Sequence, residues 1–247
     1  MKRIIFLLTA IFMCTIARAD EITINWMNTD KTINHTTTCT IGGDVNVPIP
    51  TKYGYTFNGW SANYIPIEYL ESTGTQYIDT RIIGETGIKT KMKLLMTALG
   101  AGCALGSLDG LRFQPVLMYN SNWDSVVGED KLTGSVQAYT IYITDFISNV
   151  HGYKFYVNDE LVIEGETVAY NKTANMFMFT RNDKGYIRHN MKGRIYYTKI
   201  WQDDILVRDF IPVLDGNGVP CMYDKVENKF YYNQGTGQFI AGPVIGE

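Results

Sequence analysis

The chain has 247 residues, of which 45% are hydrophobic and 19% charged, a balance that excludes an intrinsically disordered protein. Its formal net charge of −3 at pH 7 argues against a nucleic-acid-binding protein, which usually carries a basic face. Aromatic residues reach 13%, with 17 Tyr, and Gly occurs 23 times. This composition favours short strands joined by tight turns over helices.

The N-terminus has the pattern of a secretory signal peptide. Lys2-Arg3 precedes the apolar run Ile4–Ile16, and Ala17-Arg18-Ala19 follows as a small-residue cleavage site. The run is shorter than the ~20 residues that a membrane-spanning helix needs, which disfavours the alternative of an anchoring helix. We therefore expect residues 1–19 to be removed, leaving a secreted or non-covalently surface-held protein that starts at Asp20 and has no membrane span.

Three cysteines remain after this cleavage, namely Cys39, Cys103 and Cys221. An odd number in an oxidising compartment leaves at least one thiol unpaired. A Cys103–Cys221 disulfide could form, but the spacing along the chain does not establish it. The chain has no CxxC motif and no Cys/His cluster, so a structural zinc site is not expected.

Residues 20–63 form the first expected domain. The segment Ile22–Trp26 alternates apolar and polar side chains, which is typical of a half-buried strand. The domain closes with Pro50–Trp60, which reads PTKYGYTFNGW. This segment resembles the closing motif P-T-x-x-G-Y-x-F-x-G-W of the internalin-B-type (Listeria–Bacteroides) repeat at every fixed position. The resemblance implies a small β-grasp-like extracellular module.

Residues 66–247 form the second expected domain, in which no segment has a 3.6-residue apolar period. About a dozen short strand patterns at regular spacing favour a two-sheet sandwich. The strand candidates are residues 67–80, 88–96, 111–118, 139–143, 153–157, 161–163, 176–180, 194–201, 205–213, 221–223, 230–232 and 239–240.

The strand expected at residues 88–96 places three lysines on one face, Lys89, Lys91 and Lys93. Such a stripe could bind an anion. The alternative, which we favour, is a solvated strand face whose charges prevent pairing with another strand at a sheet edge.

Four segments of this domain carry a resemblance to concanavalin A-like, laminin-G-like jelly rolls of bacterial surface and phage-associated proteins. They are residues 69–80, 156–160, 199–213 and 223–237. The resemblance extends over about 67–243 and implies an all-β fold, a two-sheet antiparallel jelly-roll sandwich. Asn158-Asp159 replaces the usual Asn-Gly turn, so we expect that hairpin loop to be one residue longer. The fold itself does not specify a function, because it occurs in lectins, adhesins, sensors and hydrolases.

Catalytic patterns are sparse. Jelly-roll glycosidases need two carboxylates in one cleft, commonly two residues apart on a strand. The single acidic pair with this spacing is Glu164 and Glu166, at the expected end of a strand. The three histidines are scattered, and no G-x-S-x-G motif occurs. We therefore expect no enzymatic activity, with a glycan hydrolase as the more distant alternative.

No cofactor is expected except a calcium ion. Asn120, Asn122 and Asp124 alternate like the start of an oxygen-ligand loop, with Glu129-Asp130 downstream. An EF-hand is excluded because Ser125 and Lys131 stand where Gly and Glu are required; a polar loop between strands is the alternative interpretation.

The binding-site hypothesis centres on Trp123, which lies in a polar segment without apparent alternation. A tryptophan there is either folded back into the core or displayed for stacking on a sugar ring. The loop at 181–185 supplies further hydrogen-bonding groups. The hypothetical site, bridged by calcium if that ion binds, consists of Asn122, Trp123, Asp124, Arg181, Asn182 and Asp183.

The sequence thus predicts an exported, non-catalytic binding protein whose partner is a glycan or a surface protein. The first domain would act as a spacer and the second as a carbohydrate-binding or adhesive domain. A structural module that binds only other proteins is the main alternative.

Overall fold

The computed structural model describes residues 4–7, 21–27, 33–40, 57–61, 64–128, 133–166 and 173–245. Every regular element in these ranges is a β-strand, and none of them holds a helix that could cross a membrane. The chain divides into two compact units, residues 1–65 with 215–219 and residues 66–214 with 220–247. The boundary at residue 65 falls within β5 (Tyr64–Pro66). The predicted all-β class is confirmed.

The first unit contains β1 (Ile4–Leu7), β2 (Glu21–Met27), β3 (Ile33–Thr40) and β4 (Phe57–Ser61). The expected strand at Ile22–Trp26 is confirmed as β2, which pairs antiparallel with β3. Trp26 is buried, and its indole Nε1–H donates to Thr37 Oγ1 at 2.8 Å across this pair. The hairpin therefore has a buried side as well as a solvated one.

The signal peptide and the internalin-type repeat, both expected from the sequence of this unit, remain predictions. β1 pairs in parallel with β4 but lies in the segment expected to be cleaved, so this pairing belongs to the unprocessed chain. The cleavage site and residues 50–56 of the internalin-type motif lie outside the described residues.

The larger sheet of the second unit has the strand order β16-β15-β14-β8-β20-β21-β22-β23, with β6 paired to β20 and β24 to β6. Its strands are β6 (Leu70–Thr73), β8 (Ile88–Met96), β14 (Ile141–Asn149), β15 (Gly152–Val157), β16 (Glu160–Gly165), β20 (Lys192–Gln202), β21 (Ile205–Asp215), β22 (Pro220–Asp224), β23 (Lys229–Tyr231) and β24 (Ile240–Ala241).

The smaller sheet has the order β13-β11-β10-β9-β17-β7, with β12 on β10 and the β18–β19 hairpin joined to β9. Its strands are β7 (Ile78–Ile83), β9 (Gly102–Asp109), β10 (Leu111–Tyr119), β11 (Asn122–Trp123), β12 (Val126–Gly128), β13 (Thr133–Ser135), β17 (Asn175–Met178), β18 (Arg181–Asp183) and β19 (Tyr186–Arg188).

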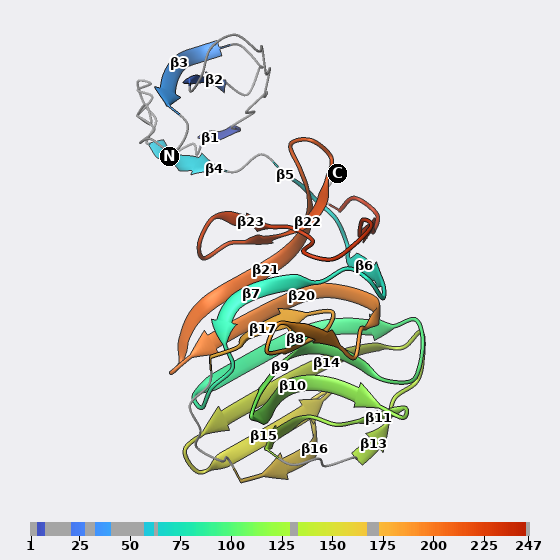
Figure 1. The fold of residues 1–247 in the computed structure, drawn as a ribbon. Coiled ribbons are helices and arrows are strands. Elements are labelled where there is room, and N and C mark those ends of the chain that lie inside the picture. Colours follow the sequence, from blue (N-terminus) through green and yellow to red (C-terminus); the bar gives the residue numbers. More distant parts are fainter. Residues whose placement is uncertain are drawn as a thin grey trace. The chain divides into compact units, whose positions relative to one another are not determined.

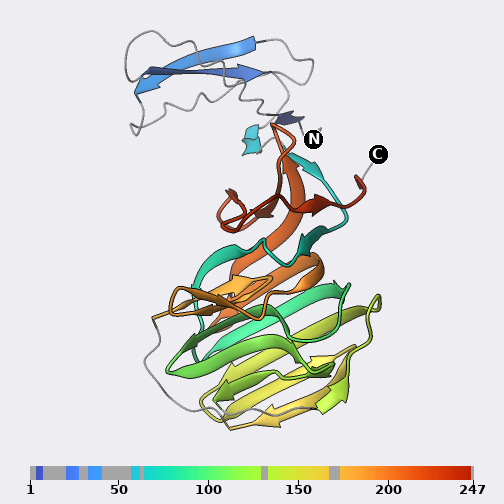
Figure 2. The ribbon, with the colours of Figure 1, turned by 45° about the vertical axis from the view of Figure 1, so that its right-hand side comes forward.

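The two sheets pack face to face, as Figures 1 and 2 show for the second unit. Phe113 of β10 and Phe146 of β14 are both fully buried, and their rings meet edge to face with centroids 5.5 Å apart. Burial of such a side chain stabilises the fold by about 1.5–3 kcal/mol. The predicted antiparallel jelly-roll sandwich is confirmed, and β18 adds to β9 in parallel.

The β15–β16 hairpin corrects one expectation about loop length. Val157 pairs with Glu160, so the loop has only the two residues Asn158 and Asp159, at φ 51° and 67°. A type I′ turn needs positive φ at both positions, and Asn and Asp tolerate this conformation better than most residues. The expected extra residue is therefore absent.

The lysines of β8 also have a different role from the one expected. β8 lies between β14 and β20, so it is not an edge strand and needs no protection from edge pairing. Lys91 Nζ lies 3.2 Å from the carboxylate of Asp145, its cross-strand neighbour, and Lys89 pairs with Asp204. These carboxylates on neighbouring elements offset the positive charge, which disfavours an anion-binding stripe.

The cysteines of the second unit are not bonded to each other. Cys103 and Cys221 are both buried, and no disulfide joins them, so the pairing that the sequence left open does not form.

Candidate functional site

The β10–β11 hairpin determines the position of Trp123. Tyr119 pairs with Asn122 across the two-residue turn Asn120-Ser121, which has φ values of 49° and 62°. Met118 pairs with Trp123 in the same register, and paired residues share one face of a sheet. Trp123 is accordingly only 2% exposed, so the hypothesis that it is displayed for stacking is wrong.

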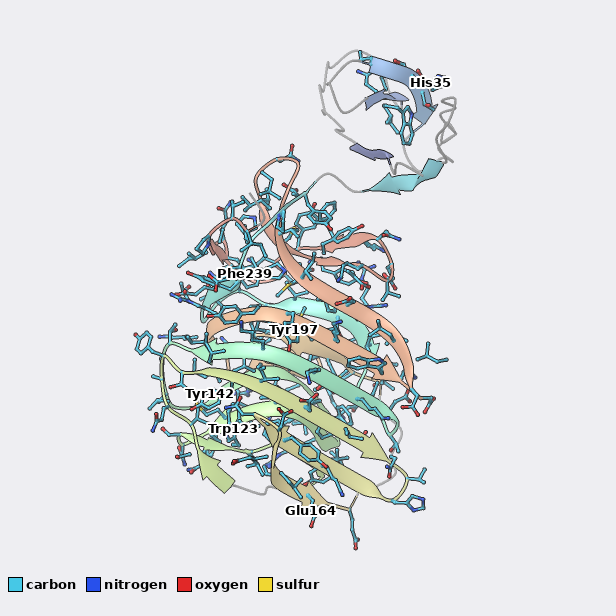
Figure 3. All side chains as sticks on the ribbon, turned by 180° about the vertical axis from the view of Figure 1, so that it is seen from behind. His35, Trp123, Tyr142, Glu164, Tyr197 and Phe239 are labelled. Carbon is cyan, nitrogen blue, oxygen red and sulfur yellow. The ribbon has the colours of Figure 1, made fainter. Side chains whose placement is uncertain are left out.

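The indole of Trp123 belongs to the core between the sheets. Its ring meets Tyr142 edge to face at 5.2 Å and Phe155 at 5.6 Å between centroids. Figure 3, with the larger sheet in front, shows Trp123 beside Tyr142. Asn122 and Asp124 were predicted to share a site with Trp123. They alternate with it along the chain and therefore lie on the outer side of the smaller sheet.

A cavity of about 280 Å³ lies on this outer side, and we call it the β10 cavity. Asp124 is held there by its backbone N–H, which donates to Leu117 O at 2.9 Å. In β10, Arg112 and Gln114 alternate with the core residue Phe113. The lining residues are Arg112, Gln114, Leu117, Tyr119, Asp124, Arg181 and His189.

A buried pair of polar side chains forms part of the lining. Gln114 is fully buried and Arg181 is 8% exposed. Arg181 Nη1–H donates to Gln114 Oε1 at 3.1 Å, and Arg181 Nη2 lies 3.5 Å from the Asp183 carboxylate. Gln114 Nε2 and Arg181 Nε have no hydrogen-bond partner among the described residues. An unmet buried donor costs about 1–3 kcal/mol.

An aromatic ring borders the same cavity. Tyr119 is 40% exposed, and its ring meets the imidazole of His189 edge to face at 6.0 Å. The backbone carbonyl of His189 accepts the N–H of Cys103 at 2.7 Å, which ties this residue to β9. The cavity thus combines a partly exposed aromatic face with buried polar groups, a combination found in small-molecule sites.

The charges around His189 favour its neutral form. Burial lowers the pKa of His189, and the positive charges of Arg181, Arg112 and Arg188 lower it further, against the opposing effect of Asp183. Its pKa therefore lies below the usual value of 6.5, which favours the neutral imidazole.

Adjacent residues of β18 line two different cavities because their side chains alternate. Arg181 lines the β10 cavity, whereas Asn182 lines a second cavity of about 510 Å³, which we call the β17 cavity. Asn182 Nδ2–H donates to Asn175 O at 2.9 Å, and its Oδ1 accepts Gly185 N–H at 2.8 Å. The lining residues are Asp79, Asp109, Thr173, Ala174, Asn175, Phe177, Asn182, Lys184 and Gly185.

The six predicted site residues therefore do not form one site. Asp124 and Arg181 line one cavity, Asn182 lines the other, and Trp123 is in the core. The amide of Asn122 donates to Asn120 O at 3.0 Å within its own turn, and Asp183 interacts with Arg181.

Five lining residues were not predicted from the sequence: Arg112, Gln114, Leu117, Tyr119 and His189. A signal for three of them was present, because the strand expected at 111–118 places Arg112 and Gln114 opposite Phe113. Recognition of Asn120-Ser121 as a two-residue turn would also have placed Tyr119 and Asn122 on the same face.

The calcium bridge stays a prediction. In the part of the chain that the structure describes, no group of three or more His, Cys, Asp or Glu side chains is placed to hold a metal ion. Glu129 and Asp130 of the expected ligand loop lie outside the described residues.

The carboxylate pair Glu164 and Glu166 lines a third cavity, of about 660 Å³, together with His151, Tyr153 and Lys154. Glu164 lies on β16 at the outer edge of the larger sheet (Figure 3). Both glutamates are exposed, whereas the acid of a glycosidase is normally held in an apolar pocket. The geometry thus gives little support to catalysis here.

Comparison with known proteins extends the fold assignment. No family model matches the chain, and no curated protein matches it. A solved structure from Bacteroides ovatus, of a protein proposed to bind carbohydrate, has a TM-score of 0.52 and 10% identity. The match covers 93% of this chain and 71% of the other. At this identity the similarity shows a shared all-β fold.

Proposed function

We propose that residues 66–247 form a non-catalytic carbohydrate-binding domain that holds a sugar in the β10 cavity. The observation that carries the proposal is the partly exposed ring of Tyr119 at the border of a cavity that the polar side chains of Gln114, Arg181 and Asp124 also line. Sugars need both features, because their C–H faces stack on aromatic rings and their oxygens take hydrogen bonds.

Each group has a separate role in this proposal. Tyr119 stacks on a pyranose face, and Gln114 and Arg181 donate to sugar oxygens. Asp124 accepts a hydrogen bond from a sugar hydroxyl. The shared fold with a Bacteroides ovatus protein that is itself proposed to bind carbohydrate supports this choice of ligand class.

The proposal includes export of the chain and a spacer role for residues 20–63. The signal-peptide pattern supports export, and the internalin-type motif at Pro50–Trp60 supports an extracellular repeat. No calcium is required at the β10 cavity, since the guanidinium groups of Arg112 and Arg181 would repel a cation there.

A glycan array with the purified full-length chain, followed by calorimetry on the best ligand, tests the proposal. Tyr119→Ala should weaken binding about tenfold, equivalent to about 1.4 kcal/mol. Tyr139→Ala is the matched control, because Tyr139 is 73% exposed and does not line the cavity, and it should leave the affinity unchanged.

Failure of every glycan to bind, or equal affinities of the two variants, would contradict the proposed function. Capture of a defined surface protein without glycan binding would favour the structural alternative. Release of reducing ends from a polysaccharide would instead establish a hydrolase.

A further inference from the structure

The β18–β19 hairpin continues the face of the smaller sheet that holds the β10 cavity. Arg112 of β10 pairs with Leu108 of β9, which in turn pairs with Asp183 of β18. Asp183 pairs with Tyr186 of β19. Paired residues share one face of a sheet, and Arg112 lines the cavity. The ion pair between Asp183 and Arg181, a second lining residue, agrees with this assignment. Tyr186 therefore lies on the same face as the cavity.

The tip of this hairpin is held in one conformation. Lys184 and Gly185 form a two-residue turn with φ values of 50° and 93°, as a type I′ turn requires. Asn182 Oδ1 accepts the N–H of Gly185 at 2.8 Å, and Lys184 Nζ lies 3.0 Å from the carboxylate of Asp109 at the end of β9. A ring carried by such a turn is already in place before a ligand arrives, which lowers the entropic cost of binding.

The side chain of Tyr186 is open to solvent and has polar neighbours. Tyr186 is 72% exposed. Asp183 faces it across the hairpin, and the exposed Arg188 lies two residues further along β19, on the same face. The ring thus has a hydrogen-bond acceptor and a donor beside it, the groups that a stacked sugar residue uses for its hydroxyls.

Tyr119 and Tyr186 lie toward opposite ends of the cavity. Tyr119 is the last residue of β10, whereas Arg112, in the row of Tyr186, is near its beginning. Tyr186 is one strand and two residues away from the lining residue Arg181, about 8 Å at a strand spacing of ~4.8 Å and a rise of ~3.3 Å per residue. The cavity of about 280 Å³ is at the small end for ligand sites, and Tyr186 is not among its lining residues. A ligand that contacts both tyrosines must therefore be a chain.

We propose that the protein binds a linear oligosaccharide, with one sugar residue in the β10 cavity against Tyr119 and another residue of the same chain stacked on Tyr186. This inference rests on the proposed function and adds to it the form of the ligand and a second contact. A sugar residue held in the cavity keeps the rest of its chain at a high effective concentration beside Tyr186, so the second contact raises the overall affinity.

The test measures how affinity depends on chain length, using calorimetry on the full-length protein. The probes are cello-, xylo-, manno- and galacto-oligosaccharides up to the hexasaccharide, and oligomers of any other linear glycan that the array identifies. Affinity should rise at least tenfold from the shortest oligomer with measurable binding to the hexasaccharide. Tyr186→Ala should remove this gain and leave the shortest oligomer unaffected, whereas Tyr119→Ala should weaken binding at every length.

Two control variants separate stacking from other effects. Tyr186→Phe keeps the ring and should keep the gain with length. Tyr139→Ala removes a tyrosine of similar exposure, 73%, and should also keep it. Because Tyr186 is exposed, its alanine variant should fold normally, which a melting curve verifies.

The outcomes distinguish this inference from the proposed function. A gain with length that persists in Tyr186→Ala, or no gain at all, would overturn the contact at Tyr186 and retain the sugar site if Tyr119→Ala still weakens binding. Binding only of branched or single sugars would overturn the linear chain and likewise retain the site. Binding of no glycan would overturn both proposals.

Discussion

The two faces of the β10–β11 hairpin carry residues that are adjacent in the sequence, but one face lies in the core and the other borders solvent. The inward face carries Met118 and Trp123, which are 2% exposed and packed in the core. The outward face carries Tyr119 and Asn122, which border solvent, and Tyr119 lines the β10 cavity. A two-residue turn with positive φ produces this separation. Residues adjacent in sequence therefore serve stability on one face and ligand contact on the other.

The β10 and β17 cavities show a second difference, in how their polar groups are used. In the β17 cavity the Asp79 carboxylate accepts from Arg81 N–H at 2.8 Å and from Asn175 Nδ2–H at 3.3 Å. Asn182 likewise uses both its amide groups within the protein. At the β10 cavity, by contrast, two buried donors, Gln114 Nε2–H and Arg181 Nε–H, have no partner among the described residues. The β17 cavity is therefore expected to be structural, although both cavities contain residue types common in sugar sites.

The largest expected effect follows from the inward face of the hairpin. Trp123→Ala should destabilise the domain by about 3–5 kcal/mol, because it removes a fully buried ring and leaves a cavity. Tyr119→Ala should cost less than about 1 kcal/mol. Urea unfolding of both variants measures this difference, and a small loss for Trp123→Ala would mean that the indole is not part of the core.

Asn182 offers a test of intermediate size, at the β17 cavity. Asn182→Ala removes the bonds to Asn175 O and Gly185 N–H, and we expect a loss of about 1–3 kcal/mol in unfolding free energy. Glycan affinity measured by calorimetry should stay within about twofold, since the side chain faces away from the β10 cavity. A variant with normal stability and weakened binding would show that the second cavity also contacts ligand.

Much of the fold could be predicted from sequence because its strands alternate regularly. β8 and the long β20–β21 hairpin were found in this way, since one face of each is buried and the other is solvated. The position of Trp123 could not be predicted, because Asn120-Ser121 looks like part of a polar loop until its positive φ values are known. Gln114 was missed because a buried glutamine in a strand becomes informative only once Arg181, 67 positions away, occupies its acceptor.

The smallest expected effect concerns the pH dependence at His189. Its folded pKa is lowered, so the neutral form is favoured by folding. The corresponding stability is present above the unfolded pKa of about 6.5 and is lost as pH falls towards the folded value.

His189→Asn, which suits the local φ of 55°, should reduce the loss of stability between pH 7.5 and pH 5 in urea unfolding. His151→Asn, in the exposed β14–β15 turn, is the control. An identical pH profile for His189→Asn and the unmodified chain would show that neither burial nor the neighbouring arginines lower the pKa of this imidazole.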